Sequence, residues 1–99
     1  MAKYRLTPRA VRDLEDIWRY TAEQWSQEQA ETYVDGLIDA METLAENPTR
    51  SRSADEIRKG YRRQNVGAHT IFFKVSGVGI VVVRILHQRM DFDSHFEPD

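Results

Sequence analysis

The feature that most constrains the fold is an apolar run near the C-terminal end of the chain, Ile80-Val81-Val82-Val83-Arg84-Ile85-Leu86. A run this rich in β-branched residues predicts a central strand that is covered on at least one face. The run contains one arginine and then gives way to His87, Arg89 and Asp91. Ionisable groups that gather at a strand end are candidates for a functional site. We therefore expect the sheet to be built around this strand.

Two amphipathic helices are expected ahead of the main strands. Thr7-Pro8 fits an N-cap followed by proline at the first helical position, and apolar residues then recur every three to four positions. Ser26-Gln27-Glu28-Gln29 matches a capping box, and Asn47-Pro48 ends the second helix. So short a link predicts an antiparallel helical hairpin. We expect Trp18 and Trp25 in the core of this hairpin.

The second helix carries an apolar stripe that is wider than one packing seam. One interpretation packs the whole stripe on the sheet, and the sequence favours it. The other leaves part of the stripe open as a groove for a partner helix. In that case the groove residues are Tyr33, Leu37, Ile38 and Met41.

The remaining strands are expected to form an antiparallel meander. A short strand covers Lys3–Leu6, and further strands are expected at 57–64, 68–75 and 80–86. If the tight loop at 77–79 has three residues, Ser76 pairs with Ile80 and His69 lies opposite His87. This register places the following residues on one face: Ile71, Phe73, Val75, Val81, Val83 and Ile85.

The predicted order is β-α-α-β-β-β, which is an α+β fold in a single domain over residues 1–99. The sequence analysis predicts that the polar tail at 93–99 is disordered when alone. The chain has no cysteine and no apolar stretch long enough to span a membrane. These features fit a reducing compartment and predict a cytoplasmic protein.

Charge divides the chain into two parts. Residues 1–49 hold ten acidic and five basic residues, whereas residues 50–90 hold two acidic and nine basic residues. A basic sheet half suits an acidic peptide or a nucleic acid. The alternative is a solvated face that happens to carry arginines.

Motifs for catalysis and metal binding are missing. The sequence has no glycine-rich phosphate loop and no Ser/His/Asp arrangement. The spacing of His69, His87 and His95, with Asp91 and Asp93, fits no pattern of metal ligands. We therefore expect no catalytic residue, no metal and no cofactor.

Arg84 lies among apolar residues, so its guanidinium must reach water, an acid or a carbonyl group. Two interpretations stay open. Arg84 forms an ion pair with an acid elsewhere in the chain, or it receives a carboxylate or phosphate from a partner.

Six segments of the chain carry a family resemblance when they are taken in order. The last is the most specific, Arg84-Ile85-Leu86-His87-x-Arg89-Met90-Asp91. The others are Leu6-Thr7-Pro8-x-Ala10-x-x-Asp13-Leu14-x-x-Ile17, Gln29-Ala30-x-x-Tyr33, Asn47-Pro48, Ile57-Arg58-x-Gly60-Tyr61-Arg62 and Gly67-x-His69-x-Ile71-Phe72-Phe73. At this spacing, the chain resembles the ParE toxins, a branch of the RelE/ParE superfamily.

The resemblance implies the toxin of a type II toxin–antitoxin system. Such a toxin is neutralised by a ParD-like antitoxin that is encoded beside it, and the two proteins form a hetero-oligomer. The toxin itself acts by binding DNA gyrase, at the A subunit of gyrase, and is not an enzyme. It implies no membrane contact and no sequence-specific binding of nucleic acid. The resemblance predicts target or antitoxin contacts at Tyr61, Arg62, Arg63, Arg84, His87, Arg89 and Met90.

The same fold hosts a second function, because RelE-like members are ribosome-dependent messenger ribonucleases. In this chain such an activity would use Arg89 with His87 or His95. No tyrosine follows Tyr61, and Thr70 stands where the ribonucleases carry an arginine, so the resemblance disfavours this alternative. A degenerate toxin without activity is a third interpretation.

Overall fold

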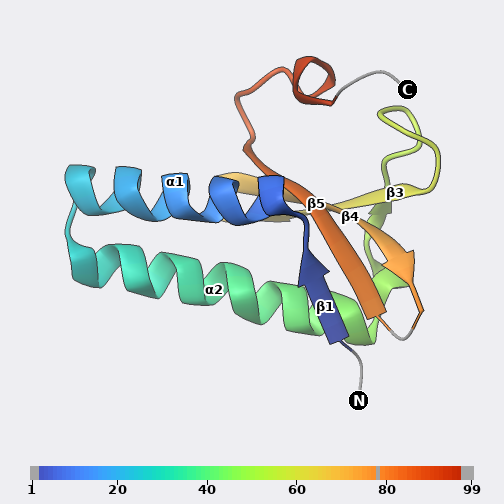
Figure 1. Ribbon diagram of the computed structural model, residues 1–99, viewed down its shortest axis with the longest axis horizontal. Coiled ribbons are helices and arrows are strands. Elements are labelled where there is room, and N and C mark those ends of the chain that lie inside the picture. The colour runs from blue at the N-terminus through green and yellow to red at the C-terminus, as the bar shows by residue number, and fades with distance from the viewer. Residues whose placement is uncertain (1–2, 78, 97–99) are drawn as a thin grey trace.

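A helical hairpin packs on one face of a five-stranded sheet (Figure 1). This computed structural model describes residues 3–77 and 79–96. The order confirms the expected α+β fold. The elements are β1 (Lys3–Leu6), α1 (Pro8–Gln24), α2 (Gln27–Glu46), η1 (Pro48–Arg50), β2 (Arg52–Ser53), β3 (Tyr61–Val66), β4 (His69–Ser76), β5 (Gly79–His87) and η2 (Asp93–His95). Among the described residues, no helix is long and apolar enough to cross a membrane.

Strand β5 lies inside the sheet, as the apolar run predicts. The strand order is β1-β5-β4-β3-β2, so β5 is paired on both sides, and its residues are buried from Gly79 to Leu86. β1 runs parallel to β5, while the other neighbours are antiparallel. The close approach of β1 needs a glycine, because a Cβ at Gly79 would fall on the carbonyl group of Lys3.

The predicted register of the β4–β5 hairpin is correct in one half and wrong in the other. His69 lies opposite His87 as expected, but Ser76 pairs with Gly79 instead of Ile80. The shift falls between Phe72 and Phe73, where Val83 is an extra residue in β5. The hydroxyl group of Thr7 caps α1 by accepting from the Ala10 amide and donates to the Val83 carbonyl at 3.0 Å. The bulge is therefore tied to the start of α1.

The bulge also changes which residues share a face of the sheet. Ile80, Val82 and Ile85 face the helices, whereas Val81 and Val83 face the other side. The predicted face that joined Val81 and Val83 to Ile85 is therefore wrong, because one extra residue reverses the alternation.

Each face of the sheet has its own hydrophobic core. The core under the helices contains the fully buried Leu37 and Met41. These two residues do not form an open groove, so packing on the sheet is the correct interpretation for them. The second core lies on the opposite face around Phe72, and Phe92 and Phe96 pack against it.

Part of the predicted tail packs on the outer face of the sheet through Phe92 and Phe96. Phe92 and Phe96 contact the Phe72 ring edge-on, with ring centroids 4.9 Å and 5.1 Å apart. Two apolar side chains thus hold the polar residues between them, including η2, on the sheet. Residues 97–99 of the predicted tail lie outside the described residues.

The strand predicted at 57–64 begins later, at Tyr61. The residues before it form a turn in which the Gly60 amide donates to Asp55 Oδ1 at 2.8 Å and Gly60 has a φ of 88°. The turn closes when the Ala54 amide donates to the Tyr61 carbonyl. A left-handed glycine ends an extended segment, so the strand starts after it.

A candidate binding groove beside helix α1

A groove of about 810 Å³ lies between the helical hairpin and the ends of strands β4 and β5. It exists because both helices run past the end of the sheet (Figure 1). Ile17, Tyr20 and Trp25 line it from the α1 side, and His69, His87 and Met90 line it from the sheet side. We call this hollow the α1 groove. Tyr20, Trp25 and Met90 are all exposed, at 64%, 77% and 44%.

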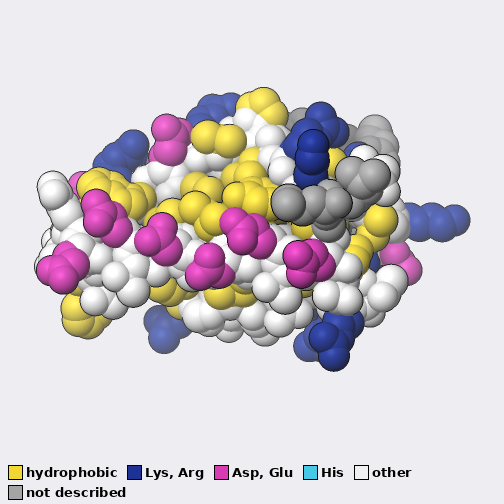
Figure 2. Space-filling view, turned by 90° about the horizontal axis from the view of Figure 1, so that it is seen from below, with side chains coloured by type: hydrophobic (Ala, Val, Ile, Leu, Met, Phe, Trp, Pro, Cys, Tyr) yellow, Lys and Arg dark blue, Asp and Glu magenta, His cyan; other side chains and the backbone are white. Residues whose placement is uncertain are grey.

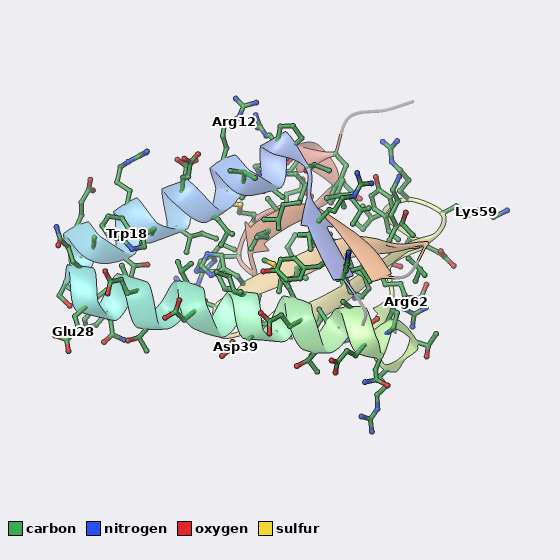
Figure 3. The ribbon with its side chains drawn as sticks, turned by 60° about the horizontal axis from the view of Figure 1, so that its bottom comes forward. Arg12, Trp18, Glu28, Asp39, Lys59 and Arg62 are labelled. Atoms are coloured by element: carbon green, nitrogen blue, oxygen red, sulfur yellow. The ribbon has the colours of Figure 1, made fainter. Side chains whose placement is uncertain are left out.

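The prediction that Trp25 lies in the hairpin core is therefore wrong. Its spacing from Ile17 and Thr21 follows the apolar face of α1, but the sheet ends before the helix does. Trp18 is half-buried (Figure 3). Sequence periodicity identifies the inner face of a helix without showing how far a partner layer extends, so it did not identify Tyr20 and Trp25 as groove residues.

The floor of the groove contains a buried ion pair between α1 and β5. Arg84 Nε donates to Asp13 Oδ2 at 2.8 Å and Arg84 Nη2 donates to Asp13 Oδ1 at 3.1 Å. The Asp13 carboxylate also accepts from the Ile85 amide at 3.0 Å. The remaining Arg84 Nη1 donates to the His95 carbonyl at 2.7 Å. Of the two open interpretations of Arg84, the structure shows the ion pair within the chain. Arg84 also lines the groove, so its contact with a partner stays a prediction.

Tyr33, His69 and His87 form a cluster at the sheet side of the groove. The Ala68 amide donates to Tyr33 Oη at 3.0 Å, and Tyr33 Oη lies 2.7 Å from His69 Nδ1. The Tyr33 hydroxyl also donates to the Val66 carbonyl at 3.5 Å, so it links α2 to the turn between β3 and β4 as well as to His69. The rings of His69 and His87 meet edge-on with centroids 5.3 Å apart. His87 Nδ1 accepts from the Arg89 amide at 3.0 Å.

His69 is held neutral by this environment. The pKa of His69 is lowered from 6.5 to about 4, mainly by burial and also by the neighbouring His87, while Asp13 acts in the opposite sense. An uncharged imidazole can form the short contact with Tyr33 either as acceptor or as donor at Nδ1. His69 thus presents an uncharged polar group to the groove at neutral pH.

The lowered pKa of His69 predicts an acid-sensitive fold. In the unfolded chain His69 binds a proton below its ordinary pKa of 6.5, whereas in the folded chain it binds one only below about pH 4. The free energy of unfolding should therefore fall as the pH drops from about 6.5 to about 4. Denaturant melts of wild type and His69→Gln at several pH values in this range measure the free energy of unfolding. Its decrease with falling pH should be steeper for wild type than for His69→Gln. A His69 imidazole that titrates near its ordinary pKa by NMR would contradict the prediction.

The predicted sheet-side residues divide between two places. His87 and Met90 line the groove, and Arg89 is exposed beside it. Tyr61 and Arg63 lie instead on β3. The Tyr61 ring contacts the Phe96 ring edge-on, and Arg63 Nη1 lies 3.5 Å from Glu56 Oε1.

Arg62 is also on β3 and is bound within the chain. Arg62 Nε donates to the Pro48 carbonyl at 3.0 Å and to Ser51 Oγ at 2.8 Å, so it fixes the turn after α2. Its side chain therefore supports the fold at the edge of the sheet. Figure 3 shows Arg62 there, with Lys59 on the preceding loop.

Two of the predicted groove residues on α2 remain partly exposed to solvent. Ile38 is half-buried, and Tyr33 is half-buried and lines the α1 groove. The outer face of α2 is acidic, and Figure 2 shows its carboxylates in a row beside a band of hydrophobic side chains. All of the acids of α2 are exposed: Glu28, Glu31, Asp35, Asp39, Glu42 and Glu46.

The lining of the groove is mostly apolar and aromatic. Within residues 3–77 and 79–96, no three His, Cys, Asp or Glu side chains come together as a metal site would require. The groove offers an apolar wall, exposed aromatic side chains and a few polar groups, which is the composition of a site for a protein segment.

Comparison with known proteins places the chain near one family. The model of the ParE toxin of the parDE type II toxin–antitoxin system matches residues 4–92. Toxin ParE1 of Mycobacterium tuberculosis strain CDC 1551 is 47% identical over 93 residues, which cover 93% of this chain and 95% of the relative. Toxin ParE1 of Caulobacter vibrioides is 41% identical over 95 residues, which cover 96% of this chain and 98% of the relative.

A solved structure shares the fold. The chromosomal ParDE system from P. aeruginosa matches with a TM-score of 0.76 at 20% identity, over 88% of this chain and 96% of that chain. At that identity the likeness concerns the fold alone.

Proposed function

Because the chain belongs to the ParE toxin family of type II toxin–antitoxin systems, we propose that it arrests bacterial growth by binding DNA gyrase and that a ParD-like antitoxin encoded beside it blocks this action. The observation that carries the proposal is the near-complete alignment with a curated toxin at 47% identity. The A subunit of gyrase is the proposed contact. The toxin acts in the cytoplasm, where gyrase works.

A binding mechanism without catalysis is supported by how the arginines are used. A ribonuclease needs free cations at the scissile phosphate. Arg84 is bound to Asp13 and to the His95 carbonyl, and Arg62 is bound to the turn at 48–51. These side chains support the fold, so they are poor candidates for a phosphate site.

The proposed contacts fall into two surfaces. The segment after β5 offers the exposed Arg89 and Met90 next to His87, and we assign these residues to the target. The α1 groove offers exposed aromatic side chains, and we assign it to the antitoxin. Met90 lines the groove as well, so an antitoxin seated there would cover part of the target surface.

Induction of the protein in bacteria tests the proposed target. We expect stalled replication, a DNA damage response and DNA breaks that disappear in cells with resistant gyrase. The matched control is Val75→Ala, which changes an exposed residue of β4 outside both surfaces and should arrest growth like wild type. Arrest of translation while the DNA stays intact would rule the gyrase proposal out.

A RelE-like messenger ribonuclease is the second candidate, and the paired rings of His69 and His87 are the feature that favours it. Two histidines within reach of one substrate can act as acid and base. Cleavage of mRNA on ribosomes in a purified translation mixture, lost in His87→Gln, would establish this activity. Intact mRNA in that mixture would dismiss it.

A further inference from the structure

The α1 groove has two chemically different ends. Arg9 and Arg12 line one end, close to the start of α1, while Tyr20 and Trp25 line the other. Arg9 lies in the first turn of α1 and Trp25 is its C-cap, sixteen positions later, which corresponds to about 24 Å at 1.5 Å per residue. The groove is therefore long enough for about four turns of a partner helix.

The charge at the first end is not balanced within the chain. Across residues 3–77 and 79–96, neither Arg9 nor Arg12 forms an ion pair or a side-chain hydrogen bond. The acids beside them are occupied, since Asp13 binds Arg84 and Asp16 lies 3.1 Å from Arg19. Two free guanidinium groups at the N-terminal end of α1, where the helix dipole is also positive, favour an anionic occupant.

The second end favours a large apolar side chain. Trp25 and Tyr20 are exposed, and Met90 faces them from the segment after β5. Exposed tryptophan and tyrosine beside a flexible methionine are typical of an anchor point in a protein interface. No acidic residue of the described chain occupies this end, and the floor between the two ends is formed by Ile17, Ile85 and Leu86.

We propose that the α1 groove binds its partner in one orientation, with an acidic end of an amphipathic helix over Arg9 and Arg12 and a bulky apolar side chain between Trp25, Tyr20 and Met90. This inference rests on the proposed function, because the occupant is the antitoxin, and it adds which end of the antitoxin segment lies where. The acidic row on the neighbouring α2 repels nucleic acid, and two free cations are few for a phosphate backbone. A protein segment is therefore the occupant.

Binding measurements with the full-length antitoxin encoded beside this gene test the two ends separately. Arg9→Glu and Arg12→Glu should each weaken binding at least about fivefold, mainly through slower association and a flatter dependence on salt. Arg5→Glu is the matched control, since it makes the same charge change at an exposed residue outside the groove lining, and it should have less effect. Trp25→Ala should weaken binding about 30-fold through faster dissociation. Val75→Ala removes an exposed apolar side chain on β4 and should leave binding unchanged.

A spin label at the acidic end of the antitoxin segment tests the orientation. It should broaden the toxin amide signals of residues 9–12 in NMR spectra and spare those of 21–25. The same spectra report whether each variant is folded. The reverse pattern, or equal broadening at both ends, would overturn the inference.

The remaining outcomes also separate the inference from the proposed function. Antitoxin that binds all variants as it binds wild type contradicts the inference alone. Antitoxin that does not bind wild type contradicts both. Groove signals that shift with a single-stranded oligonucleotide of about 12 nucleotides, and not with the antitoxin, identify nucleic acid as the occupant and overturn the proposal.

Discussion

Replacement of Asp13 by alanine is expected to lower the free energy of unfolding by about 3–5 kcal/mol, because it leaves the buried Arg84 charge without its partner. The two side chains are only 12% and 10% exposed, so water replaces the lost carboxylate poorly. The Ile85 amide also loses its acceptor. A domain of this size has about 5–15 kcal/mol of stability in total, so the loss is a large fraction. Urea melts followed by circular dichroism measure it.

Asp16→Ala is the matched control for Asp13→Ala. It removes an aspartate that also contacts an arginine, one turn further along α1, but there both side chains are more than 60% exposed. We expect a loss of less than about 1 kcal/mol, since exposed ion pairs contribute little. Equal losses for the two variants would show that burial is not what makes the Asp13–Arg84 pair important.

Phe72→Ala is expected to cost about 3–5 kcal/mol, through a cavity in the core on the outer face of the sheet. Phe72 is fully buried, and its ring supports both Phe92 and Phe96. The residues after β5 should therefore lose their packing along with the global stability. Limited proteolysis should cleave Phe72→Ala near residues 91–96 under native conditions, where wild type resists.

Val75→Ala is the matched control for Phe72→Ala, because it truncates an apolar residue of the same strand that is not buried. Val75 lies on the same strand but is 53% exposed, so its truncation should change stability by no more than about 0.5 kcal/mol. A Phe72→Ala protein that is as stable as Val75→Ala, with a protected tail, would contradict the assignment of the second core.

In the proposed function, the surface assigned to the target and the surface assigned to the antitoxin share a boundary. Met90 belongs to the segment assigned to gyrase and also lines the groove assigned to the antitoxin. Neutralisation in this proposal is therefore competition for one surface. Arg84 connects the groove to the segment after β5, because it donates to Asp13 on α1 and to the His95 carbonyl.

Local signals in the sequence determined the elements and the fold. The β-branched run predicted a central strand because such residues fit a pleated layer that is covered from above and below. Thr7 and Ser26 predicted the starts of both helices because their hydroxyl groups accept the amides of Ala10 and Gln29. The ordered motifs predicted the family. The strand and cap signals act over a few residues, and the family signal is the order and spacing of six short segments, so all of them are present in the sequence itself.

Tertiary structure alone decided the rest of the candidate site. The partner of Arg84 is 71 positions away, and no sequence spacing indicates that pairing. One bulge at Val83 reversed the faces of β5, and the short sheet left Trp25 exposed on a helix face that is apolar by its pattern. Phe92 and Phe96 fixed a tail that is polar by composition. The physical reason is the same in each case: periodicity determines which side of an element is apolar, but only packing determines which surface it meets and where that surface ends.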